Sequence, residues 1–169
     1  MASPMHRSIV VDSSVLIALN SGGRLEARLR QRKDEGYEII IPKAIAEEVV
    51  DEPKSFAEEI RERSPVLAGK IMDSVNRIDT AIEQRLIKVE TVNYRKYSKV
   101  MDNVRKHLSG LDAKPEHAIK KGDPEIIALV IQIYDEAKRK VFVSTMDKGL
   151  LKALKPFSSE VEYEILKKL

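Results

Sequence analysis

Residues 8–12 read Ser-Ile-Val-Val-Asp, a short β-branched run that ends at an acid. Similar apolar runs occur at 37–41 (YEIII) and 141–144 (VFVS), and helix-like segments at 14–19 and 44–50 follow the first two. Strands of a parallel sheet are buried on both faces, so they consist of apolar residues with little alternation. Short strands that alternate with helices predict an α/β fold with a mainly parallel sheet and helices on both of its sides.

The remaining patterns extend this arrangement along the chain. Apolar residues at three- and four-residue spacing predict long helices over 66–85 and 94–108. Further short strands are expected at 86–89 and 161–165. The chain has 169 residues, the size of one ordinary domain, and no Pro/Gly-rich linker divides it. We therefore expect a single domain over residues 1–169.

Composition excludes several kinds of protein. The chain has no cysteine, which excludes disulfides, thiolate zinc sites, iron–sulfur clusters and cysteine nucleophiles. Its longest unbroken apolar run, 126–131, is far shorter than the ~20 residues that span a bilayer. No apolar segment typical of a secretory signal precedes Ser8. We expect a cytoplasmic protein without a membrane partner.

Acids follow the predicted strands at the points where the strands end. Asp12 ends the first strand, Asp147 follows the VFVS strand, and Asp123 opens the apolar segment that leads back to that strand. The carboxyl ends of parallel strands meet at one edge of a sheet, so these acids are expected to share that edge. Glu47 and Glu48, about one helical turn beyond the second strand, are expected there too.

Each acid also has an ordinary structural explanation. Asp123, which precedes Pro124, fits a helix N-cap, and Asp147 fits the cap of the next helix. Asp12 fits a turn or a cap, and a glutamate in a helix is most often a surface residue. A functional site is favoured because one edge of the sheet would receive all of these acids.

Several carboxylates at one edge need a counter-charge. Two carboxylates ~4 Å apart repel by about 4 kcal/mol at an effective dielectric near 20. The chain offers no cysteine and only three scattered histidines, so its donors suit Mg²⁺ or Mn²⁺, which prefer hard oxygen ligands. Such a site orients water for attack on phosphorus.

Four stretches of the sequence together resemble the PIN-domain nucleases. They are IVVDSSVLIAL at 9–19, IPKAIAEEV at 41–49, GDPEIIAL at 122–129 and VFVSTMDKGLL at 141–151. They occur in the family's order and cover both halves of the chain. The resemblance implies a three-layer α/β/α sandwich, a divalent-metal site and metal-dependent cleavage of single-stranded or structured RNA.

The resemblance also implies roles for individual residues. Asp12, Glu48, Asp123 and Asp147 match catalytic, metal-binding acids of the family. Thr145 matches the hydroxyl that orients a carboxylate or a water nearby, and Ser13 takes a supporting position after the first acid.

Two positions of the implied site stay open. Glu48 matches the family's helical glutamate better than Glu47, but adjacent residues differ by only ~100° around a helix axis, so spacing does not separate them. Glu125 is a second candidate for the acid at Asp123, because some family members place that acid two positions later.

Charge is unevenly distributed along the chain. The net charge is +3 overall, −5 over 46–62 and +5 over 93–121. Residues 53–121 form an enlarged helical region compared with the smallest family members. The basic segment is either a solvated helix surface or a clamp or dimer wall that helps RNA phosphates approach the acids. The bases assigned to RNA binding are Lys96, Lys99, Arg105 and Lys106.

Other functions remain compatible with these patterns. The fold could serve as a catalytically inactive RNA- or protein-binding module. A metal-dependent phosphatase-like α/β domain also places an acid after its first strand, although a haloacid-dehalogenase-like site uses Asp-x-Asp where this chain has Asp12-Ser13-Ser14. Within the family, the resemblance leaves open a toxin held silent by an antitoxin peptide, a homodimer, and an archaeal-type housekeeping enzyme.

Overall fold

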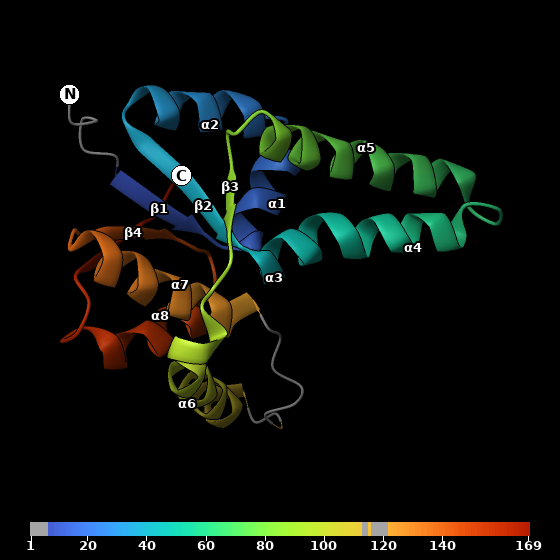
Figure 1. The fold of residues 1–169 in the computed structure, drawn as a ribbon. Helices are drawn as coiled ribbons and strands as arrows, with labels where there is room; N and C mark the ends of the chain where they lie inside the picture. Colours follow the sequence, from blue (N-terminus) through green and yellow to red (C-terminus); the bar gives the residue numbers. More distant parts are fainter. Residues whose placement is uncertain (1–6, 113–114, 116–121) are drawn as a thin grey trace.

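A single parallel sheet forms the centre of the molecule (Figure 1). The computed structural model describes residues 7–112, 115 and 122–169. The strand order is β3-β2-β1-β4-β5, and every neighbouring pair is parallel. The predicted parallel sheet is therefore confirmed. The strands are β1 (Arg7–Val11), β2 (Tyr37–Pro42), β3 (Lys88–Glu90), β4 (Val141–Ser144) and β5 (Tyr163–Leu166).

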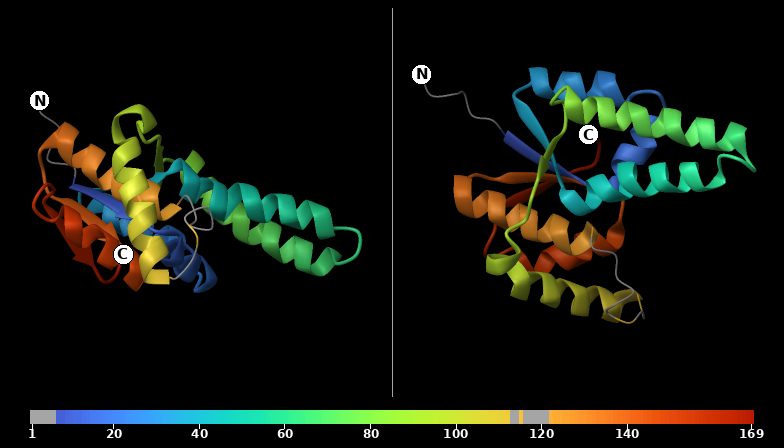
Figure 2. Two further views of the ribbon diagram at one scale, coloured as in Figure 1. Left: turned by 90° about the horizontal axis from the view of Figure 1, so that it is seen from below. Right: turned by 45° about the vertical axis from the view of Figure 1, so that its right-hand side comes forward.

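Helices cover both faces of the sheet, which confirms the three-layer α/β/α sandwich. α1, α2 and α5 lie on one side, and α7, with α6 and α8 packed on it, lies on the other (Figures 1 and 2). Their bounds are α1 (Ser13–Ser21), α2 (Leu25–Asp34), α5 (Pro65–Glu83), α6 (Tyr94–Asp112), α7 (Gly122–Ala137) and α8 (Lys148–Leu154), which the short 3₁₀ helix η3 (Lys155–Phe157) follows.

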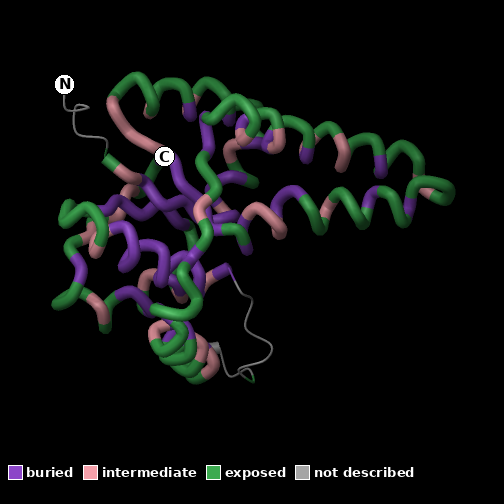
Figure 3. Tube along the Cα trace, viewed as in Figure 1, coloured by how far each residue is buried: buried purple, intermediate pink, exposed green. Residues whose placement is uncertain are grey.

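The main core lies around β1 and α7. Ile9, Val10 and Val11 of β1 are fully buried, because β1 pairs on both sides and is covered on both faces. The apolar run 126–131 of α7 is also buried, as the purple segments of Figure 3 show. Burial of apolar surface is the dominant stabilising term, at roughly 25 cal/mol per Å². The carboxyl ends of β1 and β4 are therefore rigidly placed.

One helical stretch follows β2 and leads into a projecting arm. It consists of α3 (Lys43–Ala46), the π-helical turn η1 (Glu47–Asp51) and α4 (Glu52–Ile60). α4 and α5 pack side by side and extend beyond the carboxyl edge of the sheet (Figures 1 and 2). A small separate core of Ala57, Ile60 and Ala68 holds this arm together.

The sequence patterns predicted the strands but not every helix. α2 was not expected, and α4 was expected only as part of the helical region predicted over 53–121. In α2, only Leu25 and Leu29 are buried among largely charged residues, so its apolar periodicity is too weak to detect. Among the described residues, no helix has the length and apolar character needed to cross a membrane.

Candidate functional site

Three of the expected acids meet at the carboxyl edge of the sheet. Asp12 follows β1, Asp123 lies in the first turn of α7, and Asp147 lies between β4 and α8. One carboxylate oxygen from each lies within 4.8 Å of the other two. We call these three residues the acidic cluster. Asp12 is buried, Asp123 half-buried and Asp147 exposed, so the cluster is open to solvent on one side.

The Asp12 carboxylate is held in place by surrounding donors. Its Oδ1 accepts hydrogen bonds from the Ser13 amide at 2.8 Å and the Ser13 hydroxyl at 3.4 Å. Its Oδ2 accepts from the hydroxyls of Ser14 at 3.2 Å and Thr145 at 2.9 Å. The bond from the Ser13 amide also makes Asp12 the N-cap of α1. These donors offset part of the cost of burying a charged group.

Thr145 connects two members of the cluster. Its hydroxyl donates to Asp12 and accepts from the Asp147 amide at 3.0 Å. Asp147 in turn caps α8, since its Oδ1 accepts from the amides of Gly149 at 2.8 Å and Leu150 at 3.4 Å. The capping explanation is therefore correct for Asp12 and Asp147, and the same carboxylates also belong to the acidic cluster.

The position of Asp123 differs from the N-cap expected for it. α7 begins at Gly122, so Asp123 lies inside the first helical turn. A negative charge is favourable there because the N-terminal end of a helix carries a partial positive charge.

The two adjacent glutamates of η1 point to different places. The Ser13 hydroxyl donates to Glu48 Oε1 at 3.2 Å, which ties Glu48 to the residue next to Asp12. A Cβ added to Gly122 would lie 3.3 Å from Glu48 Oε2, so Glu48 also approaches the start of α7 closely. Glu47 instead borders a surface hollow on α4 with Asp51, Glu52, Ser55, Phe56 and Glu59.

Glu125 is engaged away from the acidic cluster. It is 3% exposed. Its Oε1 accepts from the Ala44 amide at 3.3 Å and its Oε2 from the Tyr94 hydroxyl at 2.5 Å. Burial, followed by the hydrogen bond to Glu125, raises the pKa of Tyr94 to about 12. Glu125 therefore joins the first turns of α3, α6 and α7.

The four bases assigned to RNA binding lie on different sides of α6. Tyr97, Met101, Val104 and Leu108 form its buried face, and Lys99 and Lys106 are exposed on the opposite face. The Lys96 ammonium lies 5.5 Å from the centre of the Tyr97 ring. Arg105 pairs with Asp102 at 2.8 Å. Its positive charge also opposes the rise in the pKa of Tyr94.

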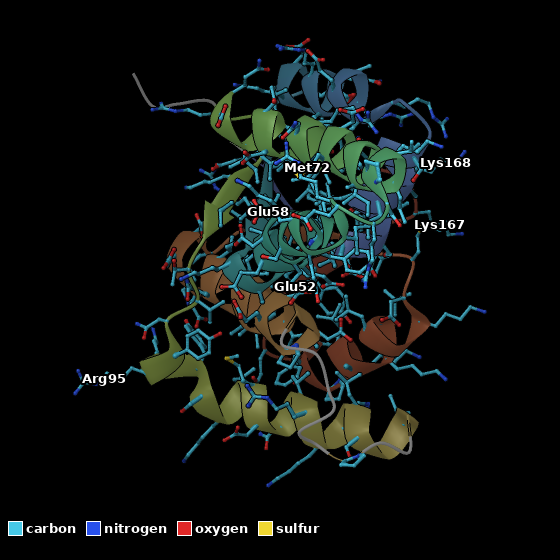
Figure 4. The ribbon with its side chains drawn as sticks, turned by 90° about the vertical axis from the view of Figure 1, so that its right-hand side faces the viewer. Glu52, Glu58, Met72, Arg95, Lys167 and Lys168 are labelled. Carbon is cyan, nitrogen blue, oxygen red and sulfur yellow. The ribbon has the colours of Figure 1, made fainter. Side chains whose placement is uncertain are left out.

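Four further bases belong to the basic segment 93–121. In Figure 4, Arg95 points outward from the start of α6. Lys114, Lys120 and Lys121 lie outside the described residues.

Two residues of this region were not expected from sequence. Ser14 donates to Asp12 and accepts from the Met146 amide at 3.2 Å, and the Asp-Ser-Ser string was the available signal for it. Tyr94 had no such signal, because its bond to Glu125 depends on how α6 packs against α7.

Carboxylates gathered at the carboxyl edge of a parallel α/β sheet define a class of candidate divalent-metal sites. A family model, the Halobacterial PIN domain, matches residues 5–165. The chain therefore belongs to the PIN-domain family, as its sequence motifs indicated. PIN domains are generally nucleases, so membership supports a nuclease-type function. A comparison with curated proteins gives no match.

Proposed function

We propose that the protein is a divalent-metal-dependent endoribonuclease. The observation that carries this proposal is the acidic cluster, in which Asp12, Asp123 and Asp147 come from three separate elements and offer oxygens within 4.8 Å of one another. PIN-family membership supports the same reaction class. Neither a disulfide nor a thiolate ligand contributes, since the chain has no cysteine.

The donor set fits a hard cation. Three carboxylate oxygens are the ligands that Mg²⁺ and Mn²⁺ prefer, and the close approach of three like charges favours binding of a cation. The acidic cluster would hold the ion, with Glu48 beside it through Ser13. When bound, such an ion lowers the pKa of a water and neutralises charge on the phosphodiester.

The chain's own residues provide positioning. Ser13, Ser14 and Thr145 fix the Asp12 carboxylate by direct hydrogen bonds. Thr145 also fixes the backbone of Asp147. Glu48 is a candidate acceptor for a proton from the attacking water, because it is half-buried next to the acidic cluster.

A cleavage assay tests the proposal. Wild-type protein should cleave RNA in Mg²⁺ or Mn²⁺ and lose that activity in EDTA, and Asp12→Asn should be inactive while remaining folded. Binding of RNA without cleavage under every metal condition would instead identify a binding module. Activity retained by Asp12→Asn would show that the acidic cluster is not the site of the reaction.

The assigned bases are tested by affinity. Replacing Lys96, Lys99, Arg105 and Lys106 with Gln should weaken RNA binding and make the affinity less dependent on salt, because each phosphate that a base neutralises adds to the salt slope. An unchanged salt slope would mean that α6 is only a solvated helix surface.

A further inference from the structure

The first turn of α7 packs closely against the helical stretch that carries Glu48. This stretch, 43–60, consists of α3, η1 and α4 without a break, and α3 lies beside the start of α7 (Figures 1 and 2). A Cβ added to Gly122 would lie 2.8 Å from Ile45 Cδ1 and 3.3 Å from Glu48 Oε2. Gly122 is directly followed by Asp123 of the acidic cluster. The packing of α3 and η1 on α7 therefore sets how far Glu48 lies from Asp123.

The start of this helical stretch is capped by a residue of α7. Its own N-cap residue, Pro42, makes no side-chain hydrogen bond to the first turn, where amides lack intrahelical partners. Glu125 supplies an acceptor, because its Oε1 accepts from the Ala44 amide at 3.3 Å. A carboxylate is also favourable there because the N-terminal end of a helix carries a partial positive charge.

The Glu125 carboxylate is fixed in this position. Glu125 is buried, and its Oε2 accepts from the Tyr94 hydroxyl at 2.5 Å. Two residues along a helix correspond to a rotation of about 200°, so Glu125 points away from Asp123 and into the contact with α3. Any effect of Glu125 on the acidic cluster therefore passes through the elements that it joins.

Gln132 is a matched residue on the same helix. It is also buried, about two helical turns after Glu125. Its Oε1 accepts from the Asn93 amide at 2.8 Å, and its Nε2 donates to the Thr91 carbonyl at 3.2 Å. Both side chains bind backbone groups, but Gln132 holds the segment that leads into α6, whereas Glu125 holds the stretch that carries Glu48.

We propose that Glu125 is a positioning residue, which caps the stretch 43–60 and thereby holds Glu48 beside Asp123. This inference rests on the proposed ribonuclease function, in which Glu48 accepts a proton. A proton acceptor must lie within hydrogen-bond reach of the water that it activates, and a displacement of ~1 Å can lower a rate on the order of 10²-fold. For this role the length of the Glu125 side chain matters more than its charge.

Two variants separate length from charge. Glu125→Asp keeps the charge but withdraws the carboxylate by one methylene, so it should lose the bond to Ala44 and lower the cleavage rate at saturating RNA about tenfold, with little change in KM. Glu125→Gln keeps the length and an oxygen for the Ala44 amide, so it should retain most of the rate. Gln132→Asn makes the same truncation at the matched residue and should leave the rate close to the wild-type value.

A double-mutant cycle identifies the residue through which Glu125 acts. In the Glu48→Gln background, adding Glu125→Asp should lower the rate less than about twofold, because the carboxylate that Glu125 positions is already absent. A purely structural loss would lower the rate by the same factor in both backgrounds.

Hydrogen exchange in EDTA tests the anchor without metal or activity. Glu125→Asp should accelerate exchange about tenfold at the amides of α3 and η1, because their contact with α7 is weakened. Gln132→Asn should leave these amides unchanged.

Four results would overturn the positioning proposal. They are a lower rate for Glu125→Gln than for Glu125→Asp, an equal loss of rate in Gln132→Asn, equal factors in both backgrounds of the cycle, and unchanged exchange in α3 and η1. These results are distinguishable from failure of the ribonuclease proposal. Cleavage that depends on Asp12 but not on the length of residue 125 removes only the positioning. A wild-type protein without metal-dependent cleavage removes the nuclease, and exchange then still shows whether Glu125 anchors the stretch 43–60.

Discussion

At the scale of single residues, the Thr145 hydroxyl joins two acids that repel each other. It donates to Asp12 Oδ2 and accepts from the backbone amide of Asp147 (2.9 and 3.0 Å). Thr145 is buried, so water cannot easily replace either bond. The acidic cluster is therefore held together before any cation binds.

Replacing Thr145 with Val tests this role. Thr145→Val keeps the shape of the side chain but leaves Asp12 and the Asp147 amide each without one partner, which should lower the free energy of unfolding by about 1 to 3 kcal/mol. Urea unfolding measures the loss. Thr145→Ser, which keeps the hydroxyl, is the control, and equal stability of the Val and Ser variants would show that the bonds contribute nothing.

The adjacent pair Glu47 and Glu48 offers a matched comparison. Both are half-buried in η1, but it is Glu48 that accepts the hydrogen bond from the Ser13 hydroxyl. Glu48→Gln should lower the cleavage rate at saturating RNA, because it removes a charged acceptor beside the acidic cluster. Glu47→Gln should leave that rate close to the wild-type value. If Glu47→Gln lowered the rate more than Glu48→Gln, the glutamate of the site would be Glu47, which borders the hollow on α4.

Tyr97 gives a stability change at alkaline pH. Burial and then its hydrogen bond to Asp135 raise the pKa of Tyr97 to about 12 from 10.0. Between these pH values the unfolded chain releases a proton that the folded chain keeps. The stabilisation is complete below pH 10 and is lost as pH rises toward 12. Urea unfolding across this range should show a shallower loss for Tyr97→Phe than for wild type, and identical slopes would contradict the assignment.

The residues that could be predicted are those placed by local sequence. Asp12 and Asp147 follow strands directly, so the parallel sheet brings them to one edge. Glu125 could not be placed in this way. It lies two positions after Asp123, but the half-turn between them directs it to Ala44 and Tyr94 instead.

At the scale of elements, the outer part of the arm of α4 and α5 has a small core of its own, whereas the second half of α5 packs into the main core. Ala57, Ile60 and Ala68 form their own small core, apart from the one around β1 and α7. A segment with few buried apolar contacts opens locally at a lower free energy than the whole protein. We expect the arm to be the first of these elements to open.

Ile60→Ala tests the independence of the arm. Ile60 is 3% exposed, and its truncation should cost about 2 to 5 kcal/mol within the arm core. Hydrogen exchange should then accelerate in α4 and the first half of α5 but not in β1 or β4. Leu29→Ala, a truncation in the main core, is the control and should accelerate exchange throughout. Equal acceleration of the strands by Ile60→Ala would mean that the arm and body unfold together.

The elements themselves were only partly predictable. The fully buried strands and α7 show continuous apolar runs, so they were detected. The stretch at 44–50 was expected as a plain helix, whereas the structure has the π turn η1 there. Helical spacing could not separate Glu47 from Glu48 because adjacent residues differ by only ~100° around a helix axis, and the π turn that begins at Glu47 had no signal in the sequence.

At the scale of the whole molecule, family and architecture were predictable because the motifs that carry them span both halves of the chain. An antitoxin partner, a homodimer and a cytoplasmic location stay predictions, because the fold of one chain does not test them. The directions of the basic side chains of α6 could not be predicted either. The sequence gives the total charge of this helix, but the contacts of Lys96 and Arg105 depend on how their side chains are oriented.

Binding of a cation should stabilise the whole fold. A ligand selective for the folded state at about 100 times its Kd adds about 2.7 kcal/mol. For a domain of this size that corresponds to a rise in Tm of about 5 to 10 °C. Calorimetry in millimolar Mn²⁺ should show this rise in wild type, EDTA should reverse it, and Asp12→Asn should lack it. The same rise in Asp12→Asn would place the ion elsewhere.

The strand order also determines when the acidic cluster can assemble during synthesis. β1 is the middle strand, but its neighbour β4 is supplied near the other end of the chain, and Thr145 lies 133 positions after Asp12. A nascent chain emerging from the ribosome thus holds Asp12 long before Asp147 exists to join it. The acidic cluster therefore cannot assemble until the segment that carries β4 and Asp147 has also been synthesised.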